Sequence, residues 1–280
     1  MKKPRLSIVG ICQNEEKDLP GFIQHLLPWV DEIILVDSGS TDQTANIAHQ
    51  YPDKVRFFAK PMNSSDGYGG QRTFGVQKAR SKWVLNMDID ERVPPELAKE
   101  ILGKIQNSPL NAYRYRRLNF FAHRPMKAGG WTSWNNPQLA KKNKHFYQGR
   151  LHEKAIIDGG ESMIGQLYQP MWHLNDDGYR ERMRKSFKYA QMEAEFLIQR
   201  QYTVKPYQLL LKPILEFIKK YIYKQGFRDG TPGLLAALHS ADSIFRTYAT
   251  AWDEQNRIPR SALEQQIQEL WNDNQSFWNE

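Results

Sequence analysis

The sequence predicts an α/β domain with a mixed, largely parallel sheet flanked by helices, followed by a helical C-terminal extension. Three observations predict it. Short apolar runs alternate with helical patterns over the first third of the chain, segments rich in aromatic residues and glycine follow, and helical periodicity then continues to the end. We therefore expect a domain over residues 1–178 and an extension over residues 179–280.

Four apolar runs are expected to form the parallel strands, because helical patterns separate them as in βαβ units. One helix begins at Asp18, one follows N-cap candidates at residues 40–42, and one continues through Ala79. After a helix that begins near Pro94, the alternating pattern of residues 113–121 indicates an antiparallel, loop-rich half. The four runs span residues 6–11, 32–37, 55–60 and 83–87.

The extension is expected to be helical, with breaks at proline and glycine. The breaks are predicted at Pro206, Pro213, residues 226–233 and Pro259. Between residues 205 and 224, apolar residues recur at helical spacing with lysines among them. A basic amphipathic helix of this kind can lie at an anionic membrane surface, and the alternative is a core-facing helix with a solvated basic face.

Composition narrows the classes of partner. The 39 Lys and Arg against 31 Asp and Glu give a formal charge of +8, which favours nucleotides, nucleic acid or an acidic membrane surface. The single cysteine, Cys12, excludes an intramolecular disulfide, and no apolar signal region follows the start, so we expect a cytoplasmic protein. No run approaches the roughly 18 apolar residues of a spanning helix, so membrane contact would be peripheral.

Polar clusters directly follow three of the predicted strands, at residues 13–16, 37–42 and 88–91. Ligands of open α/β sheets bind beyond the carboxyl ends of the strands, where these clusters would meet. Each cluster alone could be a solvated loop with helix caps. The pair Asp88 and Asp90 has a definite chemical use, since two carboxylates can hold a divalent cation that binds diphosphate oxygens and stabilises a diphosphate leaving group.

The polar motifs, in their order along the chain, resemble those of glycosyltransferase family 2, whose members have the Rossmann-like GT-A fold. Other segments resemble its lipopolysaccharide core branch, the WaaE-like glucosyltransferases. The chain departs from the family pattern at Thr73, where Asn is expected, and at residues 135–139, which replace an Arg-Leu-containing stretch. The family motifs are Asn14-Glu15, residues 36–42, Gln71-Arg72 and residues 88–91, and the branch motifs are residues 129–131, 151–153, 172–173 and 227–234.

The resemblance implies a role for each matching residue. Glu153 would be the general base of an inverting reaction, which removes the acceptor proton as that oxygen attacks the anomeric carbon. An exposed loop pair at residues 152–153 is the competing explanation, and His173 could equally be a packed or capping residue. The other implied roles are nucleotide-sugar binding by Asn14, Glu15, Asp37, Gln71, Arg72 and Asp88, metal binding by Asp88, Asp90 and His173, and acceptor binding by Gly130 and Trp131.

We therefore expect an inverting glycosyltransferase that uses Mg²⁺ or Mn²⁺ and transfers a sugar, glucose by resemblance, from a UDP-sugar. The acceptor would be a lipopolysaccharide-core-like glycolipid or another cell-surface glycan, at the cytoplasmic face of the inner membrane.

Two alternatives have less support. A nucleotidyltransferase would need a glycine-rich basic loop where residues 13–16 are acidic. A nucleic-acid-binding protein would rest on Arg114, Arg116 and Arg117 without a recognition motif, so no nucleic acid partner is expected.

Overall fold

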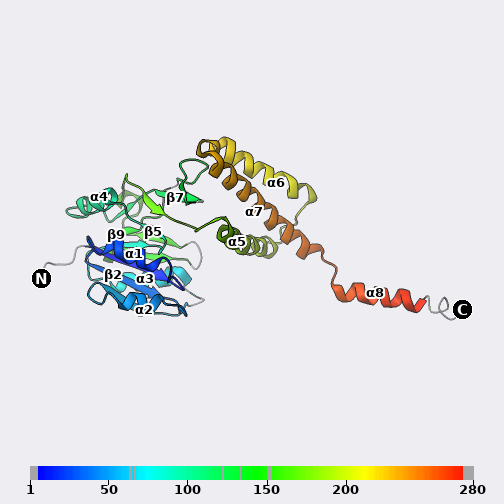
Figure 1. The fold of residues 1–280 in the computed structure, drawn as a ribbon, viewed down its shortest axis with the longest axis horizontal. Coiled ribbons are helices and arrows are strands. Elements are labelled where there is room, and N and C mark those ends of the chain that lie inside the picture. The colour runs from blue at the N-terminus through cyan, green and yellow to red at the C-terminus, as the bar shows by residue number, and fades with distance from the viewer. Residues whose placement is uncertain are drawn as a thin grey trace. The chain divides into compact units, whose positions relative to one another are not determined.

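The computed structural model describes residues 6–62, 65, 67–121, 123–132, 134–149 and 153–273. The chain divides into two compact units, Met1–Gly178 and Tyr179–Glu280. All the described strands belong to the first unit, and the described elements of the second unit are helical (Figure 1).

The first unit is built on a seven-stranded mixed sheet with the order β12-β6-β9-β4-β1-β2-β3. The strands β1 to β4 are parallel, which confirms the four predicted runs within a residue at each end. Strand β9 lies antiparallel to both β4 and β6, whereas β12 is parallel to β6. The strands are β1 (Leu6–Cys12), β2 (Glu32–Asp37), β3 (Val55–Ala59), β4 (Trp83–Met87), β6 (Ala112–Arg114), β9 (Leu139–Lys141) and β12 (Ile164–Gln166).

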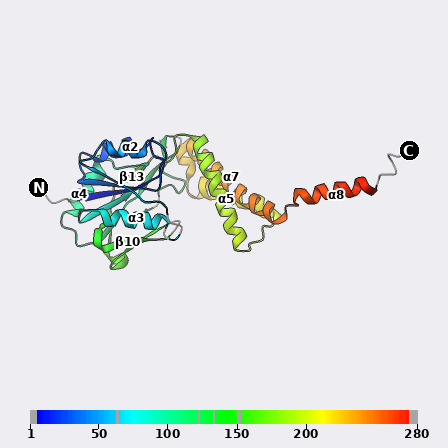
Figure 2. The ribbon, with the colours of Figure 1, turned by 90° about the horizontal axis from the view of Figure 1, so that it is seen from below.

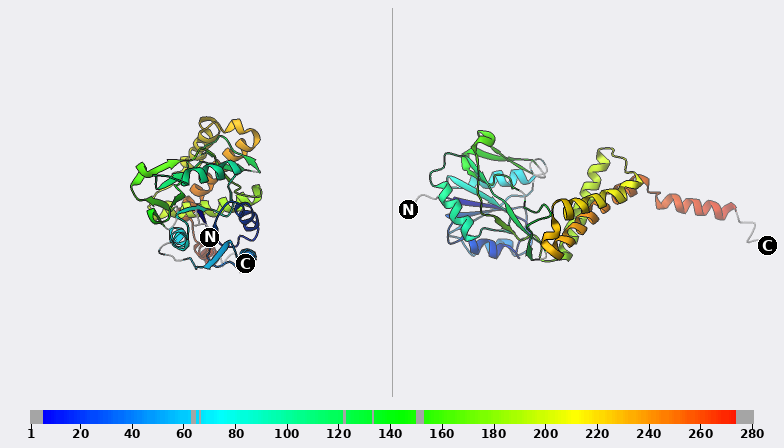
Figure 3. Two further views of the ribbon diagram at one scale, coloured as in Figure 1. Left: turned by 90° about the vertical axis from the view of Figure 1, so that its left-hand side faces the viewer. Right: turned by 90° about the horizontal axis from the view of Figure 1, so that it is seen from above.

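Helices cover both faces of this sheet (Figures 2 and 3). The core on one face contains side chains of α1, α2 and α4, and the core on the other face contains side chains of α3. Gly75 lets α3 approach the sheet closely, because a Cβ there would lie 2.4 Å from a methyl group of Val9. The helices are α1 (Leu19–Leu26), α2 (Thr44–His49), α3 (Gly67–Lys78) and α4 (Pro95–Ile105).

A second, four-stranded sheet has the order β5-β13-β7-β8. Its strand β13 is antiparallel to β5 and parallel to β7, so His173 pairs with Glu91 on one side and with Asn119 on the other. The prediction of an antiparallel half is therefore partly wrong, because these pairings between distant segments include both parallel and antiparallel strands. The strands are β5 (Glu91–Arg92), β7 (Arg117–Phe121), β8 (Arg124–Pro125) and β13 (Met171–His173), and a separate antiparallel hairpin joins β10 (His145–Gln148) to β11 (Lys154–Ile157).

The described part of the second unit contains four α-helices, with α6 and α5 both packed on α7. The predicted break at Pro213 is wrong: α6 continues through it, because the proline forfeits one backbone hydrogen bond while the helix remains packed along α7. No described helix is both long and apolar enough to span a bilayer. The elements are α5 (Tyr179–Gln199), α6 (Pro206–Ile218), the π-helical turn η3 (Lys219–Tyr223), the 3₁₀ turn η4 (Gly226–Asp229), α7 (Gly230–Asn256) and α8 (Arg260–Asp273).

Candidate functional site

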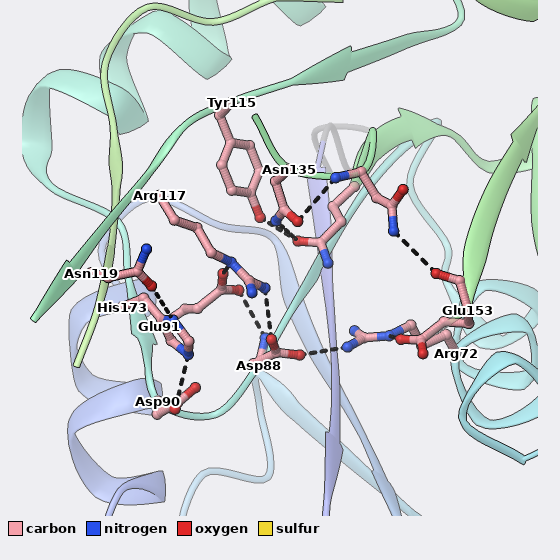
Figure 4. A network of polar contacts seen from close by, with 12 residues as sticks. Arg72, Asp88, Asp90, Glu91, Tyr115, Arg117, Asn119, Asn135, Glu153 and His173 are labelled. Atoms are coloured by element: carbon pink, nitrogen blue, oxygen red, sulfur yellow. Dashed lines mark hydrogen bonds and ion pairs between the residues drawn. The ribbon is translucent and has the colours of Figure 1, made fainter. Parts of the chain in front are cut away.

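Asp88, the first residue after β4, lies at the centre of a network of charged side chains (Figure 4). Its Oδ1 accepts a hydrogen bond from Nη2 of Arg72 at 2.5 Å, and its Oδ2 accepts one from Nη2 of Arg117 at 2.7 Å. The Nε of Arg72 also donates to Oε1 of Glu153 at 2.7 Å. Arg72 of α3 therefore joins the end of β4 to the loop before β11.

Glu91 is fully buried and contacts Asp88. Its Oε1 accepts from Nε of Arg117 at 2.6 Å, and its Oε2 accepts from the backbone N–H of Asp88 at 2.9 Å. Burial raises the pKa of Glu91 to about 7, although Arg117 opposes the change. Burial also acts to raise the pKa of Asp88, but the guanidiniums of Arg72 and Arg117 outweigh it and hold that pKa well below its usual range. Asp88 is therefore ionised.

Asp90 and His173 form a second contact beside this network. The His173 Nε2 lies 3.1 Å from Oδ2 of Asp90. Burial lowers the pKa of His173, but the hydrogen bond with Asp90 outweighs it and the net direction is upward. The register of β13 against β5 brings His173 close to Asp90, because it places His173 opposite Glu91, and Asp90 directly precedes Glu91 in the chain.

Asn119 fixes the orientation of the His173 ring. The side-chain N–H of Asn119 donates to the backbone carbonyl of Trp131 at 2.5 Å, which leaves its Oδ1 facing Nδ1 of His173 at 2.7 Å. Since an amide oxygen only accepts, Nδ1 of His173 carries a proton. The hydrogen bond to Asp90 needs a proton on Nε2, and loss of that proton would leave on Nε2 a lone pair that faces Asp90. Histidine ligands of metals are oriented in this way by a partner on the other ring nitrogen.

Asp88, Asp90 and His173 offer ligand atoms that all lie within 4.8 Å of one another. Two carboxylates and one imidazole suit a divalent cation such as Mn²⁺ or Mg²⁺. The three residues do not contribute equally, because both oxygens of Asp88 already accept from arginines. Asp90 and His173 are therefore the better-placed ligands of the three.

The loops after β1 and β2 are tied together at the same edge of the sheet. Asn14 adopts a positive φ of 58° and its Oδ1 accepts from the backbone N–H of Thr41 at 2.8 Å. The backbone N–H of Glu15 donates to the Thr44 hydroxyl at 2.7 Å. The carboxylate of Asp37 accepts from the backbone N–H of Gly39 at 3.0 Å, and this bond shapes its own loop. A contact between Asp37 and a nucleotide base stays a prediction.

The remaining predicted residues lie at three other places. Gln71 is buried, and its side chain donates to the carbonyl of Lys60 at 2.7 Å. Gly130 has a φ of 81° and precedes Trp131, whose carbonyl holds Asn119. Trp131 also contacts the ring of Phe121, with centroids 5.7 Å apart. The predicted pair Leu151-His152, which belongs to the motif with Glu153, lies outside the described residues.

Arg117 and Asn119 were missed by sequence reasoning as parts of the site. They are two residues apart on β7, so both side chains point to the same face of that strand. This alternation was the available signal, but Arg117 was grouped with Arg114 and Arg116 as a basic cluster. The structure separates the three: Arg114 pairs with Glu161, and Arg116 lies over the ring of Trp134. The basis for a nucleic-acid surface is therefore lost.

Residues 7–165 match the family described as Glycosyl transferase family 2. The chain is 30% identical to the lipopolysaccharide core biosynthesis glycosyltransferase LpsC of Rhizobium meliloti (strain 1021), covering 87% of this chain and 90% of that protein. It is 25% identical to an uncharacterized glycosyltransferase of Rickettsia felis, covering 86% and 87%. Among solved structures, S. aureus TarS 1–349 in complex with UDP-GlcNAc matches with a TM-score of 0.48 and 15% identity, over 90% of this chain and 91% of that one.

The match to the family covers more than half of the chain, and the relative LpsC is similar over most of its length. Neither the nucleotidyltransferase nor the nucleic-acid-binding alternative is favoured. The mixed sheet flanked by helices is the GT-A fold expected of such an enzyme. The chain therefore belongs to glycosyl transferase family 2 and is a glycosyltransferase.

Proposed function

We propose that this glycosyltransferase is inverting and transfers a hexose, glucose by family resemblance, from a UDP-sugar to a lipopolysaccharide-core-like glycolipid or another cell-surface glycan. One observation carries the proposal. A cluster suited to a divalent cation, formed by Asp88, Asp90 and His173, is joined through Arg72 to the carboxylate of Glu153. Leaving-group stabilisation and proton removal are the two functions that this reaction requires.

Asp90 and His173 would hold the cation, with Asp88 beside them. When bound, a divalent cation supplies positive charge that stabilises the diphosphate leaving group. Asn119 would keep the Nε2 lone pair of His173 directed towards that site, since its amide is itself held by the carbonyl of Trp131.

The tied loops after β1 and β2 would form the nucleotide pocket, with Asn14 and Glu15 lining it and Asp37 close to the base. Gln71 and Arg72 would lie beside this pocket, on the side of the donor. The contacts of Arg72 favour a positioning role over a direct phosphate contact, because its Nε and Nη2 are both engaged by carboxylates. We propose that Arg72 orients Glu153 relative to the donor.

Glu153 would act as the general base. Its backbone carbonyl accepts from the side chain of Asn136 at 3.0 Å, and its carboxylate accepts from Arg72, so both its main chain and its side chain are held. Proton removal from the acceptor hydroxyl as that oxygen attacks would give a β-linked product from an α-linked donor. Gly130 and Trp131 would contact the acceptor. A glycolipid acceptor places the protein at the cytoplasmic face of the inner membrane, in peripheral contact with anionic lipid.

The test compares Glu153→Gln with Glu161→Gln, a matched change at an exposed carboxylate that pairs with Arg114. Transfer is measured from radiolabelled UDP-glucose to core lipopolysaccharide extracted from cells that lack this protein. Glu153→Gln should bind UDP-glucose as the wild type does while its turnover falls about 10²- to 10⁴-fold. Glu161→Gln should retain both properties. Near-normal turnover of Glu153→Gln would remove Glu153 from the mechanism.

A further inference from the structure

The outward side of α6 carries large apolar side chains in contact with solvent. Six of them recur at helical spacing along α6 and into the π-helical turn η3, so they lie on one side of the helix. Between 44% and 65% of each residue's surface is exposed. We call this set the α6 stripe, and its members are Leu210, Leu211, Ile214, Leu215, Ile218 and Ile222.

The opposite side of α6 faces the interior of the helical unit. Gln208 is buried, and its side chain donates to the hydroxyl of Tyr202 at 2.6 Å. Leu209 packs against the buried cluster that contains Ala251 of α7. A surface helix ordinarily directs its apolar stripe inward and its polar residues outward. The broadest apolar face of α6 points the other way, which marks it as a contact surface.

The surroundings of the α6 stripe are cationic. From residue 205 to residue 229 the sequence has six Lys and Arg against two acidic residues, Glu216 and Asp229. The carboxylate of Glu216 and Nζ of Lys219 lie 3.1 Å apart, so these two charges offset each other and five cations remain against one acid. Lys212 and Lys219 are seven residues apart, so they lie along one border of the stripe, where Nζ of Lys212 is also 5.9 Å from the ring centroid of Tyr248 on α7. Exposed Lys224 and Tyr223 follow at the end of the stripe.

The combination of an exposed apolar stripe with cationic surroundings indicates which kind of partner contacts it. A second copy of the chain would bring two cationic borders together, and their mutual repulsion opposes such a pairing. An anionic bilayer satisfies both features at once, because its acyl region accepts the apolar side chains and its head groups attract the lysines.

We propose that the α6 stripe lies in the head-group region of an anionic phospholipid membrane, with its apolar side chains inserted and the bordering lysines against lipid phosphates. The proposal deepens the expected peripheral contact by assigning it to one surface. It rests on the proposed function only because a glycolipid acceptor would lie in a membrane. Binding of the protein to lipid vesicles is measured without any sugar transfer.

The full chain is sedimented with vesicles of phosphatidylglycerol and phosphatidylcholine at low salt, and with vesicles of phosphatidylcholine alone. We expect binding to the anionic vesicles that weakens as salt is raised, because screening reduces attraction of the lysines. The double variant Leu210→Ser, Ile218→Ser should bind about tenfold or more weakly, since the inserted apolar area is reduced. Lys212→Gln with Lys224→Gln should weaken binding only to the anionic vesicles.

The matched control is Phe146→Ser with Ile156→Ser, which removes two exposed apolar side chains from the β10–β11 hairpin and should bind as the wild type does. Circular dichroism confirms folding, and UDP binding is measured on the same samples, so a failure of the donor site is distinguishable. The proposal is overturned if anionic vesicles do not bind the wild type or bind the serine variant equally. It is also overturned if light scattering shows a dimer that the serine variant loses.

Discussion

Replacing Arg117 by methionine tests whether the charges beneath Asp88 stabilise the first unit. The side chain of Arg117 is 21% exposed, and its Nε pairs with the fully buried Glu91. Removing one partner of a buried ion pair costs about 3–5 kcal/mol, because the other charge is left buried and unpaired. We expect the free energy of unfolding at pH 8 to fall by about 3 kcal/mol, near the lower end of this range. Glu91 can take up a proton and so relieve part of the cost.

Arg114→Met is the matched control, three residues earlier. Its side chain is 24% exposed, close to that of Arg117, but its partner Glu161 is 81% exposed. Exposed ion pairs contribute about 0–1 kcal/mol to stability, so Arg114→Met should lower the free energy of unfolding by an amount within that range. Urea denaturation at pH 8 measures both variants, alone and combined with Glu91→Gln or Glu161→Gln. The coupling energy should exceed about 1 kcal/mol for the buried pair and stay within about 0.5 kcal/mol for the exposed one. Equal losses of the free energy of unfolding for the two arginine variants would show that burial of the pair with Glu91 adds no stability.

Three further predictions concern other parts of the first unit. Asn119→Ala should lower the affinity for Mn²⁺ about 10- to 100-fold in calorimetry by releasing the ring of His173, and unchanged affinity would count against that role. Burial lowers the pKa of His25 to about 4. The unfolded chain, with a histidine pKa of about 6.5, therefore binds a proton that the folded chain excludes, and the free energy of unfolding should fall by about 1.8 kcal/mol between pH 7 and pH 5. His25→Gln should lack this slope in chemical denaturation, and an unchanged slope would contradict the assignment. Gly75→Ala should lower the free energy of unfolding by about 1–3 kcal/mol, because the added Cβ overpacks against β1. At Gly103 a Cβ meets nothing within 4 Å, so Gly103→Ala should raise the free energy of unfolding by about 0.5–1 kcal/mol. Equal effects of the two variants in thermal unfolding would show that α3 does not need glycine to approach the sheet.

The parallel strands and the acidic cluster at the end of β4 could be predicted because both depend on local patterns. Short apolar runs between helical segments indicate parallel pairing, and parallel strands bring their carboxyl ends to one edge. Asp88 and Asp90 follow such a run directly. The family resemblance added His173, which local patterns alone would leave among packed histidines.

Arg117 and Asn119 could not be predicted as site residues, because their position depends on pairing between distant segments. Strand β7 lies beside β13, more than 50 residues later in the chain, and only that register places Asn119 against His173. Periodicity likewise identified α6 as amphipathic but did not say which side faces outward. The packing of α6 on α7 decides it, and that packing also explains why Pro213 does not end the helix.

If Asp90 and His173 hold a divalent cation against the diphosphate of an activated sugar, the affinity for UDP must depend on that metal. Calorimetric titration of UDP into the full chain, with and without Mn²⁺, measures this dependence. The variants are Asp90→Asn and the control Asp158→Asn, at an exposed carboxylate paired with Lys144. We predict that the wild type and Asp158→Asn bind UDP tightly only with Mn²⁺, and that Asp90→Asn loses about tenfold or more of this affinity. Equal binding of UDP with and without the metal, or by Asp90→Asn and the wild type, would show that Asp90 does not hold a cation against the diphosphate.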